Sequence, residues 1–168
     1  MQSLEKPAQK SITQLVRTSH VSDYYELSHF EQSAVSKLGR PIDIKIRQAD
    51  DVVRVEAFSD GRQIGEADLF ILREENKFVD RLYPKSYAEL TWLSVSDGFK
   101  KEGVGSAMLQ SIFSLAKQLE LKAILGVVKK WNKAAMAMDE RAGFVRIPFP
   151  ETWNGGNGTF ILLQKEIS

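Results

Sequence analysis

Apolar residues recur along this chain with two different periods, and each period predicts a different kind of element. Between Asp23 and Leu38 they fall three and four residues apart, as on one face of a helix. Ser22 is expected to cap this helix, and Gly39 with Pro41 to end it. The residues that set the spacing are Tyr24, Leu27, Phe30, Ala34 and Leu38.

The polar stretch at residues 1–10 precedes this helix and contains Pro7. Polar chain ends without apolar anchors are usually mobile, so we expect a flexible N-terminal arm there. No linker composition interrupts the rest of the sequence, which predicts one folded domain over residues 11–168.

From residue 42 onward the pattern changes to alternation, which predicts half-buried strands. Three such runs follow one another, at residues 42–46, 53–57 and 63–72. Asp60-Gly61 stands between the last two runs and is a strong hairpin signal. The charged segment at residues 73–86, which contains Pro84, is expected to be a loop.

Strands and helices alternate in the second half of the chain. The first strand spans residues 88–95, with Leu90, Trp92 and Ser94 expected on one face. The further elements are a helix from a glycine-containing turn to about Glu120, a strand at 123–128, a helix at 133–142 capped by Asn132, and strands at 144–149 and 159–167. This order predicts an α/β (α+β) single domain, with a mixed, mostly antiparallel central sheet flanked by helices.

Composition narrows the function classes. The 168 residues carry 23 basic and 22 acidic side chains, a net charge of +1, so nothing points to nucleic acid or an anionic membrane as a partner. There is no cysteine, and His20 and His29 are the only histidines, so we expect no disulfide and no metal site. No apolar run approaches a membrane span, and the first residues do not resemble a signal peptide, so a cytoplasmic location is expected.

The turn Lys100–Gly105 is the strongest candidate for a ligand site. It follows a strand and opens a helix, where free backbone N–H groups and the helix dipole favour an anion such as a diphosphate. By itself the Gly-x-Gly pattern at a helix start is more often a plain tight turn than a ligand site. It is neither a P-loop nor the longer dinucleotide fingerprint, whose third glycine is replaced here by Met108.

Two motifs together are similar to those of a known family. The first is Tyr87-Ala88-Glu89-Leu90-Thr91-Trp92-Leu93-Ser94-Val95 with Gly103-Val104-Gly105-Ser106-Ala107-Met108-Leu109; the second is the apolar strand 123–128, Asn132, a helix and Glu140-Arg141-Ala142-Gly143-Phe144. They resemble the central motifs of the Gcn5-related N-acetyltransferases (GNAT). The first half of the chain matches less well, because the family usually places two helices between its first two strands.

The resemblance implies acetyl-CoA as co-substrate and assigns residues to it. The turn would hold the pyrophosphate through Lys100, Lys101, Gly103, Val104, Gly105 and Ser106. The strand would pair its backbone with the pantetheine arm at Leu93, Ser94 and Val95, and Asn132 would contact the cofactor or simply cap its helix. Glu102 departs from the family pattern, because many members carry a basic residue beside the first glycine. A carboxylate near phosphate is unfavourable unless it points away.

The resemblance also implies catalysis by Glu89, which takes the position of a general base. Only a free amine attacks a thioester, and a carboxylate within reach can remove its proton. The other interpretation of Glu89 is a strand glutamate in a salt bridge. Asp139 replaces the tyrosine that many members use as general acid, and is more typical of a helix surface.

The expected activity is acetyl transfer from acetyl-CoA to a primary amine in a ternary complex. The acceptor could be a small molecule, a protein lysine or an N-terminus. The alternative is a non-catalytic module that binds acyl-CoA or a protein partner. Edge strands in the predicted sheet would also suit a homodimer.

Overall fold

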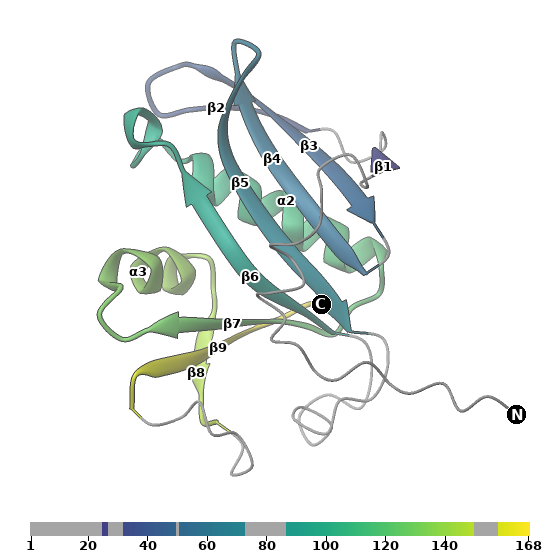
Figure 1. The fold of residues 1–168 in the computed structure, drawn as a ribbon, viewed down its shortest axis with the longest axis vertical. Coiled ribbons are helices and arrows are strands. Elements are labelled where there is room, and N and C mark those ends of the chain that lie inside the picture. The colour runs from purple at the N-terminus through teal and green to yellow at the C-terminus, as the bar shows by residue number, and fades with distance from the viewer. Residues whose placement is uncertain (1–24, 27–31, 50, 73–86, 150–157) are drawn as a thin grey trace, which may run out of the picture.

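One nine-stranded sheet organises the molecule (Figure 1). The computed structural model describes residues 25–26, 32–49, 51–72, 87–149 and 158–168. The strands follow the order β1-β3-β4-β5-β6-β7-β9-β8, with β2 also paired to β3. Their bounds are β1 Tyr25–Glu26, β2 Gln32–Val35, β3 Pro41–Ala49, β4 Val52–Ser59, β5 Arg62–Leu72, β6 Tyr87–Val95, β7 Ala123–Lys129, β8 Val145–Ile147 and β9 Phe160–Glu166. In the described residues the α-helices are α2 Val104–Gln118 and α3 Lys133–Arg141, and Asp97–Phe99 form a short 3-10 helix.

The alternating runs form the antiparallel meander that they predict. Ile42, Ile44 and Ile46 are each 1% exposed, while the residues between them face outward. Asp60 and Gly61 both have positive φ, 51° and 74°, as the two central residues of a tight hairpin turn require. The mixed, mostly antiparallel sheet with flanking helices is therefore confirmed.

The helix expected from Asp23 to Leu38 is wrong wherever the structure describes that segment. Tyr25–Glu26 and Gln32–Val35 are short strands that pair antiparallel with β3. Pairing satisfies the backbone groups along that edge of β3, a tertiary gain that the local spacing of apolar residues does not report. Ser22, Tyr24, Leu27 and Phe30 lie outside the described residues, as do the expected arm and the loop at 73–86.

Helix α2 lies across one face of this sheet (Figure 1). Its apolar stripe includes Met108, Leu109, Ile112 and Leu115, all essentially inaccessible. The stripe packs against the inward-facing residues of β3, β4 and β5 in one continuous core. Such burial of several large side chains stabilises the fold by roughly 1.5–3 kcal/mol each.

Strand β6 loses one of its two neighbours halfway along its length. It pairs with β5 from Tyr87 to Val95, but with the parallel strand β7 only where Tyr87–Leu90 lie beside Ala123–Gly126. Beyond this point the two strands diverge (Figure 1). The second half of β6 therefore has an edge to which no strand of the described chain is paired.

A β-bulge sits where the divergence begins. Leu69 is opposite Leu90, but Asp68 is opposite Trp92, so Thr91 is an extra residue. The extra residue turns Leu93 and Val95 toward α2 and leaves Trp92 47% exposed. The expectation that Leu90, Trp92 and Ser94 share one face is therefore wrong, because a bulge breaks the period of two.

Thr91→Val tests what holds the bulge. The Thr91 hydroxyl donates to the Asp68 carbonyl oxygen across it at 3.2 Å. Losing this bond is expected to lower the free energy of unfolding by about 1 kcal/mol. Urea denaturation measures the change, and Thr91→Ser, which keeps the hydroxyl, should stay near wild type. Equal stability of the valine variant would show that the bond does not hold the bulge.

Candidate active site

The turn before α2 presents backbone N–H groups at the open end of β6. Gly103 is the N-cap residue of the helix with φ of 91°, and Lys101 also has a positive φ of 63°. No side chain of the described residues caps this helix end. The first N–H groups of the helix have no intrahelical partners, so together with the helix dipole they form a site for an anion.

Gly105 sets how closely α2 approaches its neighbours. A Cβ atom built on Gly105 would lie 2.7 Å from Met138 Sδ of α3 and 3.7 Å from Leu93 Cδ2 of β6. The absence of a side chain thus lets α3 and β6 pack directly against the first turn of α2. Val104 is buried in the core and Ser106 is exposed, so Val104 can serve a ligand only through its backbone.

The unpaired edge of β6 carries hydrogen-bonding groups at alternate residues. The Ser96 amide donates to the Ile64 carbonyl on the β5 side at 2.8 Å. Because peptide groups alternate in direction along a strand, those of Leu93 and Val95 point to the opposite edge, where β7 has diverged. Ser94 directs its backbone toward β5 instead. Of the three residues expected to pair with pantetheine, two therefore have their backbone groups on the unpaired edge.

Glu89 lies on β6 just before the divergence. Its neighbours across the sheet are Phe70 on β5 and Leu125 on β7, both apolar. Burial in these surroundings raises the pKa of Glu89 to about 7. The salt bridge considered for Glu89 is absent among the described residues, where no cation lies within ion-pair distance of it.

The two acidic side chains at the turn, Asp97 and Glu102, are each paired with a basic side chain. Lys100 Nζ lies 2.6 Å from Asp97 Oδ1, and this lysine lowers the pKa of Asp97. Glu102 is only 6% exposed and turns away from the helix end. Its carboxylate accepts from the Ser36 hydroxyl and pairs with Arg40. The departure at Glu102 is therefore compatible with an anion at the turn.

The two α3 positions singled out from the sequence have different surroundings. Asn132 caps α3, since its side-chain oxygen accepts from the Ala135 amide at 3.2 Å. Asp139 is only 6% exposed, so its placement on the helix surface is wrong. It lies three residues from Met136 and three from Ala142, so it shares the side of α3 on which these two residues pack against the core. Burial raises the pKa of Asp139 to about 6.

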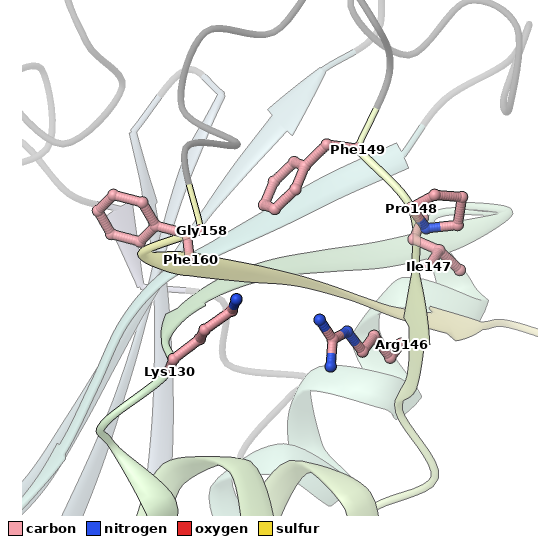
Figure 2. A pocket seen from close by; sticks show the side chains of 7 residues that line it. All are labelled: Lys130, Arg146, Ile147, Pro148, Phe149, Gly158 and Phe160. Atoms are coloured by element: carbon pink, nitrogen blue, oxygen red, sulfur yellow. The ribbon is translucent and has the colours of Figure 1, made fainter.

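A separate pocket lies where β7 ends and β9 begins (Figure 2). It has a volume of about 380 Å³ and is lined by Lys130, Arg146, Ile147, Pro148, Phe149, Gly158 and Phe160. Figure 2 shows the amine of Lys130 and the guanidinium of Arg146 near each other on one side of β9, with the Phe149 ring on the other side. Its chemistry suits a ligand with an anionic group and an apolar part.

The helix end, the unpaired strand edge and the carboxylate beside it are features that suit a class of protein, the acyltransferases that use a phosphate-bearing thioester. The family model "Acetyltransferase (GNAT) family" matches residues 13–144, and the chain belongs to this family. It is a GNAT-type acetyltransferase, and such enzymes use acyl-CoA. No curated protein matches the sequence.

Solved structures with the same fold are distant in sequence. The GNAT domain of S. lividans PAT is 16% identical, with a TM-score of 0.66 over 83% of this chain and 98% of that one. The paia N-acetyltransferase of Thermoplasma acidophilum, in complex with coenzyme A, is 18% identical, with a TM-score of 0.55 over 69% and 61%. The ribosomal-protein-S18-alanine N-acetyltransferase of Escherichia coli is 17% identical, with a TM-score of 0.56 over 72% of each chain.

Sequence reasoning missed the contacts between the site and the β2–β3 turn. Ser36 and Glu102, which are bonded, stand 66 residues apart. No local pattern connects residues so distant, and a helix across residues 23–38 would not form the turn at Ser36. In the described residues no helix is long and apolar enough to cross a bilayer.

The shifted pKa of Glu89 predicts a pH-dependent penalty on stability. Its pKa is about 7 when folded and 4.5 as a free side chain, so only the folded state keeps the proton between these values. The free energy of unfolding therefore falls as pH rises from 4.5 to 7, and the penalty is complete above pH 7.

Glu89→Gln removes this penalty. The variant should match wild type at pH 4.5 and be more stable by roughly 2–3 kcal/mol at pH 8. Chemical denaturation at both pH values measures the difference, and Asp139 cancels because both proteins contain it. A stability difference that does not change with pH would contradict the raised pKa of Glu89.

Proposed function

We propose that this chain transfers an acetyl group from acetyl-CoA to a primary amine by direct attack in a ternary complex. The observation that carries the proposal is the convergence of three features at one place. The α2 N-terminus suits the pyrophosphate, the unpaired edge at Leu93 and Val95 suits the pantetheine arm, and Glu89 lies beside the divergence of β6 and β7.

The pyrophosphate binds mainly to backbone N–H groups of Gly103 to Ser106, with Lys101 as a nearby cation. An amide-bearing pantetheine arm adds to the free edge of β6 much as an extra strand would. This places the thioester near the divergence of β6 and β7. The Asn132 amide group, whose oxygen is used by the helix cap, has its N–H donors left for the cofactor.

Glu89 accepts a proton from the ammonium form of the acceptor, directly or through one water. The free amine then attacks the thioester carbonyl carbon, forming the N–C bond and a tetrahedral oxyanion. The Val95 N–H is the candidate donor to this oxyanion. Collapse breaks the C–S bond and releases the CoA thiolate. The proton that the attacking nitrogen still carries passes to the thiolate, which gives CoA and the neutral acetylated amine, and Glu89 returns its proton to solvent.

Asp139 is not needed as the general acid in this scheme. A pKa of about 6 leaves it mostly ionised at the pH where Glu89 is an active base. The thiolate of CoA is a good enough leaving group to depart without a protein proton donor. In this scheme Asp139 is a buried residue of α3 without a role in proton transfer.

Calorimetric titration of acetyl-CoA tests the cofactor site. Wild type should bind in the micromolar range, and Gly103→Glu should lose binding, because it adds a carboxylate at the helix end and a side chain at φ of 91°. A circular dichroism spectrum of the variant controls for folding. Absence of binding to wild type would overturn the acetyltransferase proposal and favour a GNAT fold in another role.

The pH profile of turnover tests Glu89. Once an amine screen has identified an acceptor, kcat/KM should rise tenfold per pH unit below about pH 7 and level above it, because the base must be ionised. Glu89→Gln should reduce kcat at least 100-fold and keep acetyl-CoA affinity. Full turnover by Glu89→Gln would remove Glu89 from the mechanism; binding without turnover by wild type would favour the non-catalytic module.

A further inference from the structure

The β2–β3 turn, Ser36–Arg40, is attached to the anion-binding turn by a network centred on Glu102. The Ser36 hydroxyl donates to Glu102 Oε1 at 3.2 Å, and Arg40 Nε lies 3.5 Å from the same oxygen. The Lys37 amide donates to the Glu102 carbonyl at 2.9 Å. The Arg40 guanidinium also stacks over the Phe99 ring, 4.6 Å from its centre. Side chain and backbone of one residue thus hold the turn in place.

Ser36 makes the hydrogen bonds that fix the shape of this turn. Its hydroxyl accepts from the amides of Leu38 and Arg40 while donating to Glu102. Ser36 is 5% exposed, and its own amide donates to the Arg40 carbonyl at 2.8 Å. A buried hydroxyl with this many bonds leaves the turn little freedom, so the residues on it have defined positions relative to α2.

Lys37 is the residue that this arrangement places beside the anion site. Its Cγ lies 4.0 Å from the position a Cβ of Gly103 would take, at the helix N-cap. The lysine is exposed, and its flexible stem lets the ammonium reach groups around the helix end.

The balance of charge makes Lys37 available for a ligand. Of the four cations around the turn, Arg40 is paired with Glu102 and Lys100 with Asp97. Lys37 and Lys101 have no acidic partner in the described part of the chain. Two uncompensated positive charges therefore flank the free N–H groups of α2.

We propose that Lys37 binds a phosphate group of acyl-CoA and that Glu102 is the positioning residue that holds it there. This inference rests on the proposed function, since it adds a cation to the same cofactor site. It explains why a carboxylate is tolerated beside the phosphate turn: Glu102 is buried and committed to Ser36 and Arg40. A strand pair at the far side of the sheet thereby contributes to cofactor affinity.

Lys37→Gln tests the contact directly. It removes the charge and keeps most of the stem, so the Kd for acetyl-CoA should rise about three- to ten-fold. The KM for acetyl-CoA should rise by the same factor with kcat unchanged. Lys122→Gln is the matched control: it removes the same charge beyond the other end of α2, about 22 Å away, and should bind like wild type.

Titration with 3′-dephospho-CoA identifies the phosphate. An equal loss with both ligands assigns Lys37 to the pyrophosphate, and a loss confined to the complete cofactor assigns it to the 3′-phosphate. Wild-type binding with no change in Lys37→Gln would overturn this inference and leave the proposed function intact. No binding by wild type would instead overturn the proposed function itself.

Glu102→Gln tests the positioning role through coupling. If Glu102 acts by placing Lys37, the effect of Lys37→Gln on the Kd should shrink to less than twofold in the Glu102→Gln background. A purely structural role would lower the melting temperature but leave the Lys37 effect at its full size. The Lys37→Gln measurement does not depend on the Glu102→Gln variant. The phosphate contact can therefore be disproved even if Glu102→Gln does not fold.

Discussion

The early end of the β6–β7 pairing is the feature on which the rest of this site depends. Two parallel strands are bonded over only four residues each, and then separate. A strand edge inside a sheet normally has its N–H and C=O groups paired, because unpaired buried groups cost free energy. Here the Thr91 bulge turns β6 at the point of separation, so an edge with free hydrogen-bonding groups lies next to the first turn of α2.

The helices and strands around the diverging ends of β6 and β7 fix the positions of the polar groups there. The core between α2 and the meander β3–β5 fixes the helix axis, and Gly105 allows α3 and β6 to approach its first turn. Glu89 lies on the bonded half of β6, among apolar neighbours, where burial raises its pKa toward neutrality. The same burial that costs stability therefore brings the pKa of this carboxyl close to neutral pH.

Among the described residues around the helix end, both acidic side chains are paired with a cation. Asp97 and Glu102 each pair with a cation, and Lys37 Cγ lies 4.0 Å from the position that a Cβ of Gly103 would take at the helix N-cap. The buried carboxylate of Glu102 also links residues 66 positions apart, Ser36 among them.

The sequence by itself determined the parts that depend on local patterns. The alternation of Ile42, Ile44 and Ile46 and the apolar stripe of α2 each show a period of burial. The Asp60-Gly61 pair predicts a hairpin turn, and the glycine turn marks the start of the helix.

Tertiary structure decided what depends on distant contacts. Residues 32–35 became a strand because β3 offered an edge, and Trp92 turned outward because Thr91 bulged against β5. Asp139 was buried by the packing of α3, and Glu102 was directed to Ser36 rather than to the anion site. Such outcomes arise from pairing and packing between segments far apart in the chain, which the spacing of residues within one segment does not encode.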